Sequence, residues 1–236
     1  MNELVPSFKK SLFEPTINIS SDLIELGIDQ LLDNEVIKDI PIVGVIVKLS
    51  KAVVAIRDRY LLKKLIIFIK SINDGSISQE KLDEHRRQLE SEPKKLYEEL
   101  EKIMIIVDRQ LDIEKTMILG NFYKSYINGS IDWDDFGHFS DILERLFISD
   151  IYELKRIYDV QFFKQGDKVI DISLSRLSAI GLVKYFNGMS VVMSENGDGL
   201  TIPMLCLIHE IGKVFYKEGI EQLIVEGKIS FSDGIN

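Results

Sequence analysis

The histidines and the single cysteine are the side chains of this 236-residue chain best suited to nucleophilic or metal chemistry. Cys206 and His209 are three residues apart, so on a helix they would share one face and supply half of a zinc site. No second Cys or His pair completes the set, and His209-Glu210 is not followed by the second histidine of a zinc-protease helix. We therefore expect no catalytic residue, no metal site and no cofactor, with Cys206 as a buried thiol on an apolar face.

An acidic loop, NGSIDWDDF, resembles the later half of a calcium-binding EF-hand loop. In that register Asp135 stands where a bidentate glutamate is required. The early ligand positions then fall on Lys124 and Tyr126, and neither residue type binds calcium. A helix N-cap at Asp132, followed by acidic residues in the first helical turn, explains the same residues without a metal.

The most unusual segment runs from Ile37 to Lys70, where very apolar residues alternate with basic ones. It carries eight basic and two acidic side chains, a net charge of +6. Because the whole chain has a net charge of −9, the remainder of the chain has a net charge of −15. On one continuous helix a polar stripe would be shared by Lys48, Lys51, Arg59, Lys63 and Lys70. This pattern favours contact with an anionic membrane or an acidic protein partner. The alternative is a central core helix whose lysines reach solvent between packed neighbours.

Glycines and short apolar runs after residue 160 indicate a small α+β module. We expect a helix over 173–186, a strand over 189–193, a turn at the NGDG sequence of 196–199, a returning strand at 200–201, and a helix over 203–219. This order is typical of a winged-helix-like module. Four basic and five acidic side chains lie between residues 170 and 220, so the phosphate contacts that DNA binding requires are few.

The remaining elements are predicted from capping residues, prolines and helical periodicity. Residues 1–19 should form a surface arm. Helices are expected over 22–34, over 41–73 (continuous, or broken around 57–60), from Ser78, from Pro93, from Asp112 to Asn128, from Asp132 and from Ser149. We expect the domains to be a helical bundle over 1–163 and the winged-helix-like module with its tail over 164–236, giving a mainly α fold class.

Composition excludes several classes of protein. With 45% hydrophobic and 28% charged residues, the chain is neither disordered nor fibrous. The net charge of −9 disfavours a general nucleic-acid coat. A single cysteine permits no intrachain disulfide and indicates a reducing compartment, and the N-terminal residues do not resemble a signal peptide. We expect a cytoplasmic protein, peripheral to the inner membrane if it binds lipid.

Three segments together resemble a known bacterial group. They are IPIVG with the following apolar-basic helix, then DIEKTMILGNFYKSYINGSIDWDDF, then SRLSAIGLVKYF. Their layout is similar to that of small helical proteins of the abortive-infection alpha-like group, some of which occur in phage-defence settings. The resemblance implies a defence or stress role and supplies no catalytic residues.

These observations predict a non-enzymatic interaction protein. In this hypothesis the segment 41–70 meets a membrane surface or an acidic protein partner, and the protein is a homo-oligomer or a member of a complex. The alternative is a DNA-binding transcription regulator that uses the C-terminal module, although nucleic acid is not the expected partner. An enzyme is disfavoured because no nucleophile, base and metal set converges in the sequence.

Overall fold

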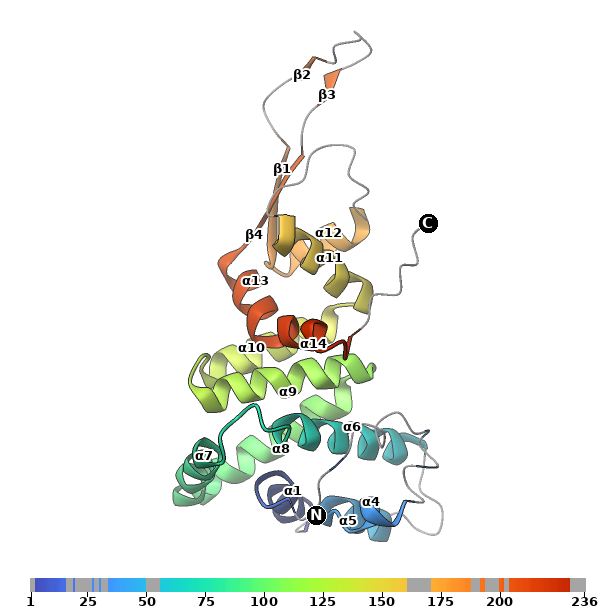
Figure 1. Cartoon of the computed structure of the whole chain (residues 1–236), viewed down its shortest axis with the longest axis vertical. Helices are drawn as coiled ribbons and strands as arrows, with labels where there is room; N and C mark the ends of the chain where they lie inside the picture. Colours follow the sequence, from blue (N-terminus) through green and yellow to red (C-terminus); the bar gives the residue numbers. More distant parts are fainter. Residues whose placement is uncertain are drawn as a thin grey trace. The chain divides into compact units, whose positions relative to one another are not determined.

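The structure, a computed structural model, describes residues 3–15, 19, 27, 30, 34–49, 56–160, 171–187, 192–193, 200–201 and 204–229. Over these residues the chain is mainly helical, which confirms the predicted fold class at that level (Figure 1). The chain divides into two compact units, Met1–Ser140 and Asp141–Asn236. The division falls within helix α10 (Trp133–Arg145), earlier in the chain than the predicted division at 163/164.

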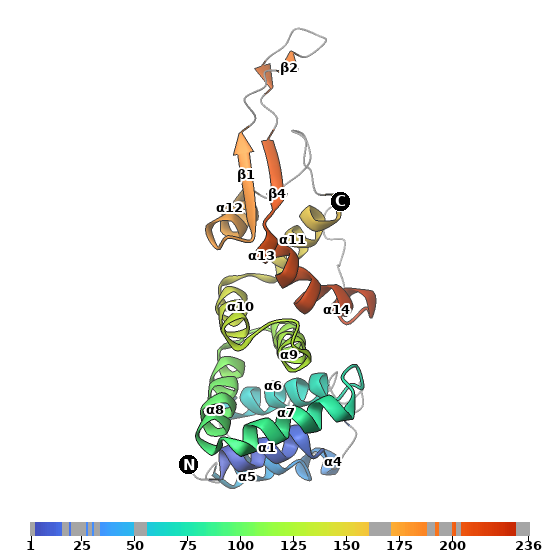
Figure 2. The same ribbon diagram turned by 90° about the vertical axis from the view of Figure 1, so that its left-hand side faces the viewer.

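The first unit is built from helices. The described ones are α1 (Leu4–Phe13), α4 (Glu35–Lys38), α5 (Pro41–Leu49), α6 (Ile56–Ile72), α7 (Gln79–Ser91), α8 (Pro93–Arg109), α9 (Ile113–Asn128) and the first half of α10. Both views place α6 between α9 on one side and the α1–α5 pair on the other (Figures 1 and 2). Both faces of α6 are therefore covered along its second half, where Leu65, Ile66, Ile67, Phe68 and Ile69 are all buried.

Local capping signals set the helix ends as predicted. The Ser78 hydroxyl accepts a hydrogen bond from the Lys81 amide at the start of α7, and Gly129 ends α9 in the left-handed region with φ 76°. The acidic loop forms a helix cap: the Asp135 amide donates to the Asp132 carboxylate at 2.8 Å, and the Asp132 amide donates to the Asp135 carboxylate at 3.2 Å. Both carboxylates are thus used as caps, which is the alternative to a calcium loop.

The prediction for the N-terminal residues was wrong. Residues 4–13 form α1 and bury Phe8 and Leu12 completely. Val5, Phe8 and Leu12 recur at helical spacing, so one apolar stripe faces the core. Pro6 lies in the first turn of α1, where a proline lacks no hydrogen bond that the helix needs. The predicted helix over 22–34 lies almost wholly outside the described residues.

The segment 41–73 forms two described helices, α5 and α6, with residues 50–55 outside the described part of the chain. The two helices contact each other, and Ile46 of α5 lines the same groove as Leu65 of α6. In one straight helix these two residues would be about 28 Å apart at 1.5 Å per residue. Helices α5 and α6 are therefore not parts of one straight helix. The break lies between Leu49 and Ile56 and not around 57–60 as predicted, because residues 57–60 lie within α6.

Helices α6 and α9 approach closely because Gly120 lies where they meet. A Cβ atom added to Gly120 would lie 2.6 Å from Ser71 Cβ, which is closer than two non-bonded carbon atoms can approach. Around this point Phe68 and Tyr123 pack with ring centroids 5.7 Å apart. The glycine thus lets the aromatic side chains of both helices fill the core of the first unit.

Replacing Gly120 by alanine tests this close approach. Gly120→Ala is expected to lower the free energy of unfolding by about 1–2 kcal/mol, because the overpacking penalty exceeds the helix propensity that alanine adds. Gly137→Ala in α10 is the matched control, since its added Cβ meets only the flexible end of Lys102 at 3.3 Å. Urea titration of both variants makes the comparison. A Gly120→Ala protein as stable as the Gly137→Ala protein would contradict the close packing.

The second unit combines short helices with two small antiparallel sheets. After the second half of α10 come α11 (Ile148–Val160), α12 (Asp171–Ala179), β1 (Val183–Asn187), β2 (Val192–Met193), β3 (Leu200–Thr201), β4 (Met204–Ile208), α13 (Glu210–Phe215), the π-helix η1 (Tyr216–Glu221) and α14 (Gln222–Val225). Strand β1 pairs with β4, with Val183 opposite Ile208, and β2 pairs with β3. The NGDG sequence lies outside the described residues.

Two predicted helices of this unit are partly strands. Residues 183–186, predicted as the end of a helix, lie in β1, and residues 204–208, predicted as part of the start of the next helix, form β4. Gly181, with φ 81°, ends α12: its amide donates to the Ser178 carbonyl, and the Leu182 amide donates to the Leu177 carbonyl. This is the Schellman arrangement of a helix C-terminus. Beyond it, pairing with β4 satisfies the backbone of β1.

Candidate functional site

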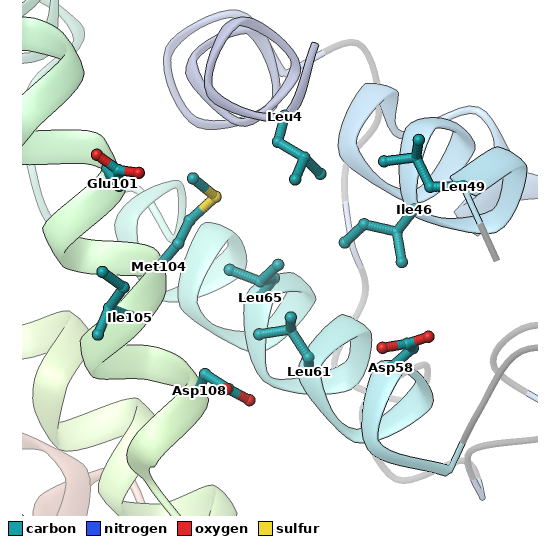
Figure 3. Close-up of a pocket in the computed structure, with 10 residues that line it drawn as sticks. All are labelled: Leu4, Ile46, Leu49, Asp58, Leu61, Leu65, Glu101, Met104, Ile105 and Asp108. Atoms are coloured by element: carbon teal, nitrogen blue, oxygen red, sulfur yellow. The ribbon is translucent and has the colours of Figure 1, made fainter. Parts of the chain in front are cut away.

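An apolar groove of about 370 Å³ opens between four helices of the first unit (Figure 3). Its lining is mostly aliphatic and includes three carboxylates. The residues that line it are Leu4, Ile46, Leu49, Asp58, Leu61, Leu65, Glu101, Met104, Ile105 and Asp108. We call this surface the apolar groove. Because it is concave, mostly apolar and lined by side chains from several helices, we take it as the candidate functional site.

Each wall of the apolar groove is one face of a helix. Leu61 and Leu65 are four residues apart on α6, and Met104 lies opposite them on α8. Leu4 comes from α1, and Ile46 from α5. In the close-up Leu4, Ile46, Leu65 and Met104 point toward the space that the helices share (Figure 3).

Large aliphatic side chains stay exposed on opposite sides of the apolar groove. Leu49 of α5 is 57% exposed and Ile105 of α8 is 49% exposed. Tyr97 extends the same face of α8, since it precedes Glu101 by four residues, and it too is exposed. Soluble proteins seldom leave such residues together around a concavity unless something binds there.

Polar contacts fix α6 against α8 beneath the apolar groove. The buried Lys64 ammonium donates to the backbone carbonyls of Asp108 and Gln110, at 2.5 Å and 2.9 Å, at the C-terminus of α8. Carbonyl groups at the end of a helix have no amide donor within the helix, so the lysine satisfies them. A cation at this end is also stabilised by the helix dipole. Burial lowers the pKa of Lys64, and the nearby Asp108 carboxylate opposes that effect. The Arg57 guanidinium adds an ion pair of 2.5 Å with Asp108.

A serine fixes α1 against α5 at the other side. The Ser11 hydroxyl accepts a hydrogen bond of 3.0 Å from the Ile42 amide and donates one of 2.9 Å to the Ser7 carbonyl. The Ile42 amide lies in the first turn of α5, where an amide has no acceptor within its own helix. Ser11 thus supplies an acceptor for the buried Ile42 amide, which a purely apolar contact between the two helices would leave without a hydrogen bond.

The buried face of α8 carries a polar cluster that holds the helix in place. The Glu99 carboxylate accepts hydrogen bonds from the Tyr123 hydroxyl at 2.9 Å and the Tyr126 hydroxyl at 3.3 Å. His85 Nε2 lies 3.2 Å from Glu99 Oε1 and 3.1 Å from the Tyr123 hydroxyl oxygen. Burial, aided by the Glu99 charge, raises the pKa of both tyrosines. We call these four residues the Glu99 cluster; it joins α7, α8 and α9.

The sequence does contain a signal for the Glu99 cluster that pattern reading missed. Glu99 lies three residues after Leu96 and four before Ile103, on the apolar face of α8. A carboxylate at that position of an amphipathic helix must be buried with partners, since an unpaired buried charge is very costly. Its partners come from α7 and α9, and nothing local in the sequence identifies them.

The predicted basic residues are divided between two helices. Lys48 lies on α5 and is exposed, while Arg59, Lys63 and Lys70 lie on α6 at spacings of four and seven residues, sharing one face. Lys51 is outside the described residues. None of the four described residues lines the apolar groove. Arg57 and Lys64, which a single helix would place opposite the predicted stripe, contact Asp108 of the groove-forming helix α8.

Cys206 and His209 do not share a helix face. Cys206 lies on β4 and is buried, as predicted, and burial together with the Glu153 carboxylate raises its pKa to about 11. His209 follows β4 and precedes α13. Across the described ranges, no three His, Cys, Asp or Glu side chains are grouped so as to hold a metal ion. Over the same ranges, none of the helices has the length and apolar character needed to cross a membrane.

Comparison with known proteins finds no match. No protein-family model, no curated protein and no solved structure matches this chain. The functional proposal therefore rests on the apolar groove and the residues around it.

Proposed function

We propose that this protein is a non-enzymatic interaction protein that binds a protein partner through the apolar groove of its first unit. The observation that carries the proposal is the pair of exposed aliphatic walls, Leu49 and Ile105, on either side of a concavity of about 370 Å³. Burying such side chains contributes about 25 cal/mol per Å² of apolar surface. That gain is available only when a partner covers the apolar groove.

The proposal keeps the segment 41–70 as the contact element and changes which of its residues make the contact. Four of the seven aliphatic or methionine residues that line the apolar groove come from this segment: Ile46, Leu49, Leu61 and Leu65. The predicted basic residues of α6, which are Arg59, Lys63 and Lys70, do not line the apolar groove. We therefore propose that the apolar side chains of this segment, and not its basic ones, contact the partner. The acidic partner expected from the basic stripe is then not required.

The setting we propose is bacterial defence or stress. It rests on the resemblance to the abortive-infection alpha-like group, whose quoted segments include α5, α6, α9 and the α12–β1 region. An interaction protein suits such a role because it can act by occupying a partner, without catalysis.

A second candidate is a DNA-binding regulator that uses a winged-helix-like second unit. The order α12, β1, β4, α13 and the five-residue antiparallel pairing of β1 with β4 favour it. Against it, Arg176 of α12 is held by two hydrogen bonds to the buried Asp150 carboxylate. This cation is then not available to contact a phosphate, so we rank the candidate second.

Two single substitutions test the proposed function. Ile105→Glu adds a charge to the wall of the apolar groove, while Leu111→Glu makes the same change at a leucine that is 88% exposed and does not line it. Both side chains are exposed enough that the fold should be kept, which circular dichroism and thermal unfolding can check. In affinity purification from the source cell, we expect Ile105→Glu to lose at least about tenfold of the principal bound protein.

Leu111→Glu should retain the wild-type amount of that bound protein. Equal recovery by all three proteins would contradict a role for the apolar groove. If Ile105→Glu instead loses binding to anionic vesicles, the result would favour a membrane surface as the partner. If it loses binding to DNA, the result would favour the regulator candidate.

A further inference from the structure

We infer that the segment bound in the apolar groove is an amphipathic helix with lysine or arginine beside its apolar face. This inference rests on the proposed function and deepens it by naming the chemistry of the partner. It follows from what the groove walls can and cannot recognise.

The backbone around the apolar groove excludes strand addition. All four walls are helices, α1, α5, α6 and α8, and apart from the helix ends their backbone groups are hydrogen-bonded within each helix. An extended peptide that adds to a sheet needs an open strand edge, and the described residues of the first unit form no strand. A peptide in extended form would leave its own backbone groups unpaired against aliphatic side chains.

The side chains that line the apolar groove also exclude a proline-rich peptide. Grooves that bind polyproline II segments are lined by aromatic residues. This lining contains leucine, isoleucine and methionine and no aromatic ring. Aliphatic walls with a flexible methionine, here Met104, are typical of grooves that accept the apolar face of a helix. Such a helix satisfies its own backbone and inserts side chains at positions i, i+3 or i+4, and i+7.

Charge determines what stands beside those apolar positions. The polar residues in the lining are Asp58, Glu101 and Asp108, and all three are acidic. Asp108 is paired with Arg57 and also lies 3.8 Å from the buried Lys64 ammonium, so its charge is largely balanced within the protein. Glu101, an exposed carboxylate on the wall formed by α8, therefore carries the attraction for a cation of the partner. A partner helix with acidic flanks would be repelled, and a basic one attracted.

A library of displayed helical peptides, selected on the full-length protein, tests this inference. Peptides are kept if they bind wild type and fail to bind Ile105→Glu. We expect them to carry apolar residues at i, i+3 or i+4, and i+7, with lysine or arginine alongside. For the best peptide, Glu101→Lys should weaken binding about fivefold, and exchanging its nearest cation for glutamate should restore binding to that variant. Glu84→Lys, an exposed change on α7, is the matched control and should leave the affinity unchanged.

The outcomes separate this inference from the proposed function. If the groove-dependent peptides have neutral or acidic flanks, or if Glu101→Lys does not change their affinity, the inference of a basic partner helix is wrong. The proposal that the apolar groove binds a protein would still stand. Failure to obtain any groove-dependent peptide would overturn both. A wild-type dimer that becomes a monomer in Ile105→Glu, measured by sedimentation, would assign the apolar groove to a second copy of the chain and overturn the inference.

Discussion

Glu99→Leu is expected to lower the free energy of unfolding of the first unit by about 3 kcal/mol. The change removes the carboxylate that accepts hydrogen bonds from the hydroxyls of Tyr123 and Tyr126 and that lies 3.2 Å from His85. Tyr123 is completely buried, so its hydroxyl cannot turn to water. Each buried donor left without an acceptor costs about 1–3 kcal/mol. Urea titration, followed by the fluorescence of Trp133, measures the loss.

Two further variants separate a hydrogen-bonding role from simple packing. Glu99→Leu combined with Tyr123→Phe should recover part of the loss, because the orphaned hydroxyl is removed as well. Glu98→Leu changes the neighbouring, exposed glutamate and should stay within about 0.5 kcal/mol of wild type. If the double variant instead loses the full sum of the two single changes, the Glu99 cluster does not act as one network.

Asp150→Ala is expected to destabilise the second unit by about 3 kcal/mol. Asp150 is completely buried and accepts two hydrogen bonds from Arg176, at 2.9 Å and 2.5 Å, and one from the Phe147 amide at the start of α11. Removing one partner of such a pair costs about 3–5 kcal/mol when both are buried, and the partial exposure of Arg176 favours the lower value. Hydrogen exchange measured on peptides of α11 and α12 reports this unit separately.

The same pair makes the second unit sensitive to acid. Burial of Asp150 opposes its ionisation, but Arg176, the Phe147 amide and Ser173 outweigh that effect and hold its pKa below the ordinary 3.8. In the window between the two values the unfolded state binds more protons than the folded state, so stability decreases as the pH is lowered. The contribution is fully present above pH 3.8 and is lost as the pH falls through the lower folded pKa. Hydrogen exchange of wild type and Asp150→Ala should therefore converge below that window.

Most helix ends of the first unit could be predicted because their causes are local. Ser78, Pro93 and Gly129 act on the one or two turns beside them, and the structure uses all three as expected. The Asp132–Asp135 cap is equally local. Long-range pairing decides the strands: β1 continues a pattern that also suits a helix, and only β4, some 20 residues later, makes it a strand. The glycine at 181, which ends α12, was the local signal to use.

The apolar groove could not be predicted because its walls are brought together only by the fold. Leu4 and Asp108, far apart in the sequence, line the same surface. The sequence correctly drew attention to the segment 41–70, but the single-helix stripe required a straight course that the break between α5 and α6 does not provide. Similarly, Glu99 has its partners on α7 and α9, so its burial follows from three helices meeting.

Site-specific photo-crosslinking from the wall of the apolar groove tests the central claim most directly. A photoreactive amino acid placed at Ile105 reaches only atoms within a few ångströms, and the same group at Leu111 is the matched control, since both positions are exposed. In the source cell we expect one principal protein adduct from position 105, with the crosslinked site in a helix of the partner, and no such adduct from position 111. Identical adducts from both positions, or none from position 105, would contradict a protein-binding groove.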